Sequence, residues 1–174
     1  MRKLLRAIEF ATVAHKEQKR KYTGEPYILH PIRVAMKVAE VSTNEDALAA
    51  AVLHDTVEDT YVTSAMITKE FGIEVANMVD WLTDVSTPAH GNRAARKLVD
   101  RMFIANAPII VKTIKLADLI DNSDSIVKHD ESFSKVYMEE KRRLLTVLKA
   151  GNETLFKEAT NIVEDYYRDT SRES

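Results

Sequence analysis

The sequence has 174 residues, of which 45% are hydrophobic, and it carries 25 Lys and Arg against 27 Asp and Glu. This length suits one domain with its own core, and the interspersed, nearly balanced charge excludes the cationic surface of a duplex nucleic-acid binder. The absence of cysteine excludes disulfides, thiolate metal sites and cysteine nucleophiles, and it fits a reducing compartment.

The amino-terminal segment predicts a first helix. Apolar residues recur there at the three-four spacing of one buried stripe, namely Leu4, Ala7, Ile8, Ala11 and Ala14. We expect this helix to end near Tyr22, before Gly24. The segment lacks the apolar stretch of a signal peptide, and no run in the chain reaches the roughly 18–20 apolar residues of a membrane span. We therefore expect a cytoplasmic protein with no membrane partner.

A proline-rich segment, residues 25–31, follows and interrupts the helical pattern. Pro26 and Pro31 each push the preceding residue out of the α region. Pro31 fits the first position of the next helix, with His30 as its cap. Residues 42–45 then offer a stop and a new N-cap.

The next helix is unusual because residues 47–53 are all apolar and predict burial on every side. The run leads directly into ionisable residues, which need partners or a metal at the end of a buried helix. Further helices are expected over 63–71, 72–82, 92–105, 109–127, 134–149 and 153–167, with a loop at 88–91. The sequence thus predicts an all-α fold, a single compact bundle of about eight to ten helices over residues 1–170, with a polar tail at 171–174.

Four residues are candidate ligands of one divalent cation: His30, His54, Asp55 and Asp118. Neighbours on a helix point about 100° apart, so His54 and Asp55 can reach one ion and leave the rest of its shell open. Two imidazoles and two carboxylates suit manganese or ferrous iron and also accept zinc, cobalt or nickel. A water in an open position would have its pKa lowered toward neutrality, which suits hydrolysis.

Three polar residues follow these candidates by four positions. On a continuous helix, Glu58 and Asp59 would lie beside the cation, and Asn122 has the same relation to Asp118. Simpler explanations are surface or capping acids for the first two and a helix–helix hydrogen bond for the third. A cationic cluster is similarly either a solvated helix end or an anion site; it comprises Lys16, Lys19, Arg20 and Lys21.

Three segments together resemble one enzyme family. They are residues 15–31 (HKEQKRKYTGEPYILHP), 53–60 (LHDTVEDT) and 114–122 (IKLADLIDN). In order and spacing they are similar to the HD hydrolase domain of RelA/SpoT-type alarmone enzymes, and to stand-alone small alarmone hydrolases such as the metazoan SpoT homologues. The resemblance covers nearly the whole chain and leaves no residues for synthetase or regulatory domains, so it implies hydrolysis without synthesis.

The resemblance also implies roles for individual residues. Manganese would bind at His30, His54, Asp55 and Asp118, and Glu58 and Asp59 would assist the hydrolytic water. The implied substrate contacts are Arg20 and Lys21 to base and phosphates, Asn122 to ribose or phosphate, and Tyr137 beside the nucleoside. One departure concerns residues 123–125, Ser-Asp-Ser, where the long enzymes have Met-Arg-Thr. An anion thus replaces a cation near the site, which bears on the identity of the substrate.

These features predict manganese-dependent removal of the 3′-pyrophosphate from a guanosine or adenosine alarmone, (p)ppGpp or (p)ppApp. Lys19, Lys112 and Lys115 are further candidates for neutralising phosphate charge; Lys115 has the alternative of pairing with Asp118. Two other hypotheses are a phosphatase for another nucleotide, such as NADPH, and a sensor that binds nucleotide and metal without turnover. The expected partner is a small-molecule nucleotide rather than nucleic acid, and both a monomer and a homodimer are compatible with the sequence.

Overall fold

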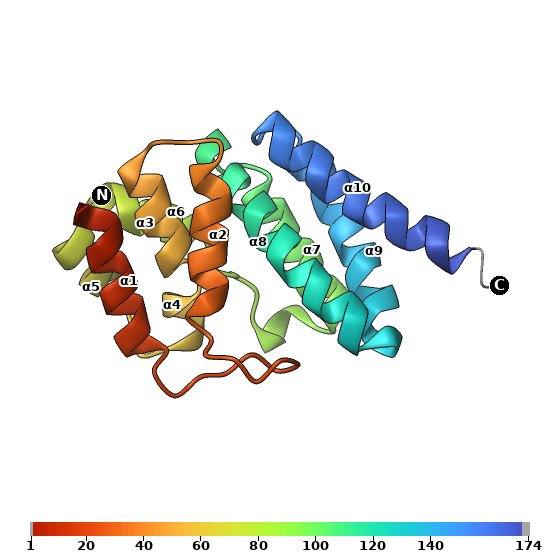
Figure 1. The fold of residues 1–174 in the computed structure, drawn as a ribbon, viewed down its shortest axis with the longest axis horizontal. Coiled ribbons are helices and arrows are strands. Elements are labelled where there is room, and N and C mark those ends of the chain that lie inside the picture. Colours follow the sequence, from red (N-terminus) through yellow and green to blue (C-terminus); the bar gives the residue numbers. More distant parts are fainter. Residues whose placement is uncertain (1, 172–174) are drawn as a thin grey trace.

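The computed structural model describes residues 2–171, apart from the side chains at 124 and 125, and this part of the chain is helical without a β-strand (Figure 1). Its elements are α1 (Arg2–Ala14), α2 (Leu29–Ala39), α3 (Glu45–Leu53), α4 (Thr56–Asp59), α5 (Ser64–Phe71), α6 (Ile73–Leu82), the 3-10 turn η1 (Pro88–His90), α7 (Arg93–Ile104), α8 (Ile109–His129), α9 (Glu131–Leu148) and α10 (Glu153–Thr170). The predicted all-α fold is confirmed, and the ten α-helices of these residues agree with the expected number.

Helix α3 forms the centre of the core. It packs against α1, α2, α6 and α8, and every residue from 47 to 53 is buried, as the uninterrupted apolar run predicts. Burial of a single large aliphatic side chain such as Leu53 stabilises the fold by about 1.5–3 kcal/mol. Asn44 caps α3 by accepting hydrogen bonds from the backbone N–H groups of Asp46 and Ala47, which confirms the predicted N-cap region.

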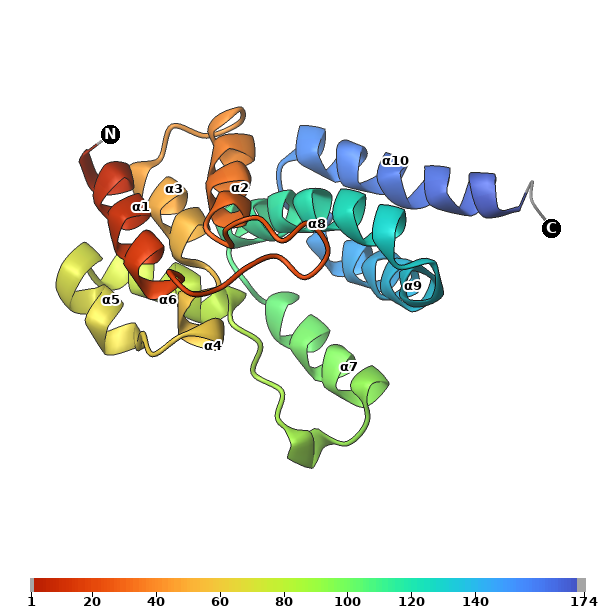
Figure 2. The same cartoon turned by 60° about the horizontal axis from the view of Figure 1, so that its bottom comes forward.

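The remaining helices divide around this core. Helices α1, α5 and α6 lie on one side, α8, α9 and α10 lie on the other, and α2 contacts both α3 and α8 (Figures 1 and 2). Helix α7 projects away from the body and approaches it through α6 and α9 (Figure 2).

The first helix is shorter than predicted, because α1 ends at Ala14 rather than near Tyr22. The next residues form a loop that folds back on itself. The N–H of Arg20 donates to the carbonyl of Glu25 at 2.9 Å, and the N–H of Tyr27 donates to the carbonyl of Gln18 at 3.0 Å. These cross-loop hydrogen bonds replace helical ones, so tertiary context overrides the helical propensity of the segment. The cationic cluster therefore lies in a loop, not at a helix end.

The predicted role of His30 as a cap is wrong, because α2 begins one residue earlier, at Leu29, with Ile28 at the N-cap. Pro31 is consequently the third residue of the helix. A proline is tolerated there because the first four N–H groups of a helix have no intrahelical acceptor. The N–H of His30 instead donates to the carbonyl of Tyr27 at 3.0 Å, which fixes the histidine in the first turn.

The helix that leads into the acidic residues is not continuous. It ends at Leu53, His54 is its C-cap, and α4 begins at Thr56. The hydroxyl of Thr56 donates to the carbonyl of Leu53 at 2.7 Å, which satisfies a carbonyl that a longer helix would use. His54 and Asp55 thus lie at a bend rather than on one regular helix.

At the carboxyl-terminal end, α10 extends to Thr170, so the ordered helix reaches the predicted domain limit. The division at residue 170 stays a prediction, since positions 172–174 of the polar tail lie outside the described residues. Within the described part of the chain, no helix combines the length and the apolar character that a membrane span requires.

Candidate metal centre

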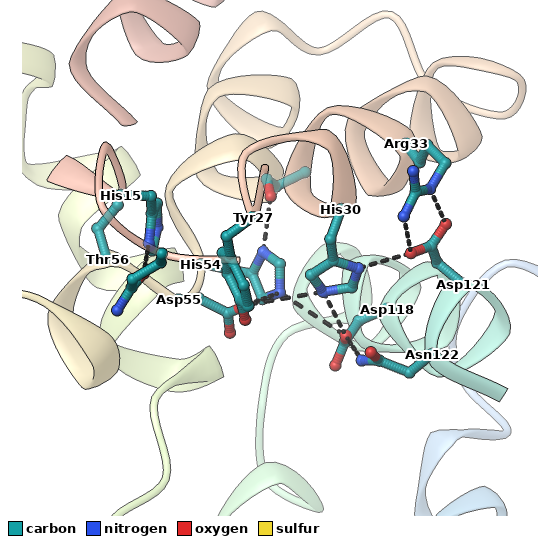
Figure 3. Close-up of polar contacts among 12 residues, drawn as sticks. His15, Tyr27, His30, Arg33, His54, Asp55, Thr56, Asp118, Asp121 and Asn122 are labelled. Atoms are coloured by element: carbon teal, nitrogen blue, oxygen red, sulfur yellow. Dashed lines mark hydrogen bonds and ion pairs between the residues drawn. The ribbon is translucent and has the colours of Figure 1, made fainter. Parts of the chain in front are cut away.

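The four predicted ligands converge although they come from separate elements. His30 lies on α2, His54 and Asp55 at the bend between α3 and α4, and Asp118 on α8 (Figure 3). The Nε2 atom of His54 lies 3.0 Å from Oδ2 of Asp55 and 3.7 Å from Oδ1 of Asp118. The Nε2 atom of His30 lies 3.6 and 3.3 Å from the same two oxygens. Two nitrogens and two carboxylate oxygens therefore surround one point.

The second nitrogen of each imidazole fixes the orientation of its ring. The Nδ1–H of His54 donates to the carbonyl of Ala51 at 2.8 Å, and the Nδ1–H of His30 donates to Oδ2 of Asp121 at 2.7 Å. Each Nε2 lone pair is thereby directed at the centre, the usual arrangement for metal-ligating histidines. The Nε2 atom of His54 is buried and makes no hydrogen bond to any described residue, so the donor set fits a divalent cation.

The charges of the centre are tightly coupled in the metal-free protein. Burial lowers the pKa of His54, but the carboxylates of Asp55 and Asp118 outweigh burial and raise that pKa to about 10. Burial raises the pKa of Asp118, yet the ammonium group of Lys115 and the two histidines hold it well below its usual range. The two carboxylates thus favour the protonated form of His54 in the metal-free protein, and a bound cation would provide the same charge compensation.

Sequence reasoning missed the residues that support His30. Nε of Arg33 donates to Oδ1 of Asp121 at 2.6 Å (Figure 3). Nη2 of Arg33 donates to Oε1 of Glu25 at 2.8 Å. A chain of charges therefore runs from Glu25 through Arg33 and Asp121 to the imidazole. The sequence contained a signal for these residues in its helical spacing. Arg33 follows His30 by three residues, and Asp121 follows Asp118 by three, a spacing that brings side chains to the same face of a helix.

Two residues of the loop between α1 and α2 also support the centre and were not singled out. The hydroxyl of Tyr27 donates to Oδ2 of Asp55 at 2.6 Å. Nε2 of Gln18 donates to the backbone carbonyl of Asp59 at 2.7 Å, and the side chain of Gln18 is held in turn by Nδ1 of the buried His15. The folded-back loop thus positions one ligand and one candidate catalytic acid.

A cavity of about 870 Å³ opens from the centre toward α7 and α9. Glu58 and Asp59 lie in its wall beside Asp55 and Asp118. Partial burial in this wall, reinforced by the charge of Asp84, raises the pKa of Glu58, whose Oε2 accepts a hydrogen bond from the N–H of Asp84 at 3.2 Å. Partial burial and Asp55 likewise raise the pKa of Asp59. Both acids are placed where a proton could be exchanged with a ligand in the cavity.

The predicted substrate contacts are distributed unevenly. Asn122 lines the cavity, and its Nδ2 donates to Oδ1 of Asp118 at 2.6 Å. Arg20 and Lys21 lie on the loop outside the lining, with Arg20 6.0 Å from the ring centre of Tyr27. Tyr137 is buried and does not line the cavity.

The remaining cationic candidates and the departure at 123–125 are placed as follows. Lys115 lines the cavity and pairs with Asp118 at 3.0 Å. Lys112 instead donates to the carbonyl of Ala105 at 2.7 Å and is not part of the lining. The hydroxyl of Ser123 is buried and donates to the carbonyl of Leu119 at 2.7 Å. The side chains at 124 and 125 lie outside the described part, so the effect of the replaced cation stays a prediction.

In a comparison with known protein families, residues 7–152 match the HD domain family. Among curated proteins, the guanosine-3′,5′-bis(diphosphate) 3′-pyrophosphohydrolase of Aquifex aeolicus is 40% identical over 141 residues, which cover 79% of this chain and 18% of that protein. A probable GTP pyrophosphokinase of Mycobacterium leprae is 40% identical over 119 residues, 67% of this chain and 15% of that protein. The chain thus spans less than a fifth of the length of these curated relatives.

Among solved structures, a metazoan orthologue of SpoT, described as hydrolysing ppGpp and acting in starvation responses, superimposes with a TM-score of 0.86 at 27% identity. The match covers 94% of this chain and 95% of that one. A protein of Listeria monocytogenes EGD-e superimposes with a TM-score of 0.70 at 27% identity, over 85% of this chain and 99% of that one.

Proposed function

The chain belongs to the HD domain family, and from this membership we propose that it is a manganese-dependent hydrolase of alarmones. It would remove the 3′-pyrophosphate of (p)ppGpp or (p)ppApp. The curated relative from Aquifex aeolicus and the metazoan structural neighbour, both named for this activity on ppGpp, support the choice of substrate.

The observation that carries the proposal is the position of Glu58 and Asp59 in the wall of the cavity, next to the converging ligands Asp55 and Asp118. A divalent cation held there would polarise a phosphate oxygen and lower the pKa of a water. The two acids lie beside that point without being part of the donor set. Such a division between holding a cation and exchanging protons is what hydrolysis requires.

In the proposed reaction, water attacks the phosphorus attached to the ribose 3′ oxygen. The bond between this phosphorus and the 3′ oxygen breaks. The ribose 3′ oxygen is the leaving group and receives the proton that the water gives up, so that ppGpp becomes GDP and the water oxygen becomes part of the released pyrophosphate. Glu58 would take the proton of the water, because its raised pKa suits proton exchange near neutral pH. Asp59 would orient the water, with its backbone held by Gln18.

Manganese is proposed because two imidazoles and two carboxylates form a mixed donor set that accepts this ion readily. The family and the cluster of His30, His54 and Asp55, whose ligand atoms all lie within 4.8 Å of one another, support a divalent metal in general. A monomer and a homodimer are both compatible with the proposal, and a cytoplasmic location stays a prediction. The same holds for Arg20, Lys21, Asn122 and Tyr137 as substrate contacts.

Product analysis by ion-exchange chromatography tests the proposal. Metal-stripped protein is incubated with ppGpp, ppApp or NADPH, with and without manganese. Manganese-dependent release of pyrophosphate from ppGpp or ppApp is expected. Release of orthophosphate from NADPH alone would favour the nucleotide phosphatase, and tight binding without any product would favour the sensor.

A matched pair of variants separates turnover from binding. Glu58→Gln is expected to lower kcat by about 10²–10⁴-fold and to leave manganese affinity unchanged, since Glu58 is not among the ligands. Glu164→Gln, on the exposed surface of α10 and outside the cavity, serves as the control. An unchanged kcat in the Glu58 variant would remove this residue from the mechanism.

A further inference from the structure

We propose that Lys141, supported by Lys115 and Lys97, binds the distal phosphate of the leaving pyrophosphate, so that the cavity selects a 3′-diphosphate over a 3′-monophosphate. The inference rests on the proposed alarmone hydrolysis and adds a specificity residue on α9 to it. Its basis is a set of lysines in the cavity whose positive charge is only partly neutralised by the protein.

The three lysines come from three helices and line the same cavity. Lys97 lies on α7, Lys115 on α8 and Lys141 on α9. The Nζ atom of Lys115 lies 3.0 Å from Oδ2 of Asp118, beside the metal-ligand cluster. The Nζ atom of Lys97 lies 2.5 Å from Oδ2 of Asp84, farther along the wall. Two of the three cations therefore have a carboxylate partner.

Lys141 differs from these two. Among the described residues, no carboxylate lies within 4.0 Å of its Nζ atom, which instead rests 4.6 Å from the ring centre of Tyr137. Its side chain is half-buried. Burial lowers the pKa of Lys141 to about 8; the charge of Asp118 acts against this shift, and repulsion from Lys115 and Lys97 adds to it. A desolvated ammonium group without a counterion is unfavourable until an anion approaches it.

The neighbouring acids on α9 are engaged by other groups. Glu140 accepts hydrogen bonds from Nε and Nη2 of Arg93 at 2.7 and 2.9 Å. Glu139 accepts from the guanidinium groups of Arg142 and Arg143 at 2.7 to 3.1 Å. These bidentate contacts hold both carboxylates away from Lys141, so its charge remains available to a ligand in the cavity.

The order of the lysines along the wall suggests which phosphate each one meets. Lys115 touches a metal ligand and so lies beside the phosphorus under attack. No described carboxylate, Asp118 included, lies within 4.0 Å of Nζ of Lys141, so this ammonium group lies farther from the metal-ligand cluster than that of Lys115. A distal phosphate fits there, and a 3′-monophosphate would leave Lys141 without an anion. The geometry therefore distinguishes alarmones from nucleotides with a single phosphate ester, such as NADPH.

The test measures binding in the Glu58→Gln protein loaded with manganese, which limits turnover. Isothermal titration calorimetry compares ppGpp with ppGp, which has one phosphate on its 3′ oxygen. We expect ppGpp to bind about tenfold or more tightly, as one charge-assisted contact provides. Adding Lys141→Gln should remove most of this preference by weakening ppGpp alone, and adding Lys141→Arg should retain it.

Lys149→Gln is the matched control, because Lys149 is exposed at the end of α9 and lies outside the cavity. Manganese affinity, measured in the same titrations without nucleotide, should be equal in all variants and would reveal a misfolded one. Equal loss of affinity for ppGpp and ppGp in the Lys141→Gln protein, or no loss for either, would overturn the proposal.

Failure of the parent proposal would look different. If wild-type protein released no pyrophosphate from any alarmone, the proposal of alarmone hydrolysis would be refuted. A binding preference for ppGpp that depends on Lys141 would still support the phosphate subsite. If pyrophosphate were released but the binding preference for ppGpp over ppGp did not depend on Lys141, only the proposed phosphate subsite would be refuted.

Discussion

The Nδ1 atom of His30 lies 2.7 Å from Oδ2 of Asp121, a residue that is not itself one of the converging ligands. Asp121 is also fixed from the opposite side by Arg33, at 2.6 Å. This contact orients the Nε2 atom of His30 toward Asp118 and raises the basicity of the ring, because the carboxylate stabilises the Nδ1–H tautomer. The centre thus depends on a residue outside its donor set.

Replacing that carboxylate should weaken metal binding without removing a ligand. We expect Asp121→Asn to lower manganese affinity by about 10–100-fold, measured by isothermal titration calorimetry. Asp165→Asn is the control, since Asp165 pairs with Arg168 on the exposed surface of α10. Equal manganese affinity in wild type and Asp121→Asn would show that the negative charge of Asp121 is not needed to orient His30.

Metal binding should release protons at neutral pH. In the metal-free protein the pKa of His54 is raised to about 10, so this histidine is protonated at pH 7 and must lose its proton to become a ligand. Manganese affinity should therefore rise with pH up to about 10. Titrations in two buffers with different ionisation enthalpies give the number of protons released, and a value near zero at pH 7 would contradict the prediction.

The same histidine gives the metal-free protein a pH-dependent stability. Its pKa is higher in the folded state than the ordinary 6.5, so the contribution is complete below pH 6.5 and is lost as pH rises toward 10. Urea unfolding of metal-stripped protein should show a decreasing free energy of unfolding across this interval. His54→Asn should flatten the decrease, and an equally steep decrease in that variant would assign it to other groups.

Lys141 should favour binding of its proposed ligand and lower the free energy of unfolding of the ligand-free protein. Burial lowers its pKa from 10.5 to about 8, so the protonated form is disfavoured in the folded state. Replacement by Met should raise the free energy of unfolding at pH 7 by an amount on the order of 1 kcal/mol. The gain should vanish as pH rises from about 8 through 10.5, where the folded and then the unfolded lysine are neutral. A destabilised Lys141→Met protein would show that the lysine makes a favourable contact in the free state.

Gly151 lies where the α9–α10 connection meets α8. A Cβ atom at this position would lie 2.7 Å from Cδ1 of the buried Leu116 and 3.2 Å from the carbonyl oxygen of Leu148. Gly151→Ala should therefore lower the free energy of unfolding by about 1–3 kcal/mol, as overpacking does. Thermal unfolding compares it with Gly24→Ala, where a Cβ meets no atom within 4 Å but the φ of +70° is strained. An unchanged melting temperature for Gly151→Ala would show that Leu116 can repack without loss.

Much of the fold follows from local signals. The scarcity of glycine and proline and the apolar spacing predict an all-α chain, and the apolar run at 47–53 predicts the central buried helix. The sequence also indicated the candidate metal centre, because His54 and Asp55 at the end of that run conflict with burial unless a partner compensates them. These inferences depend on the spacing of residues close together in the chain, which can be read from a single sequence.

Other features were decided by contacts between residues distant in the chain. The hydrogen bonds of the loop after Ala14, rather than helical propensity, end α1, and the fold brings Asp121 to Arg33 and His30 across 88 and 91 positions. The environment of Lys141 likewise depends on α7, α8 and α9 meeting around one cavity. The sequence determines which residues can ionise or pack, but charge coupling and desolvation depend on distance in space, and only the tertiary structure decides that distance.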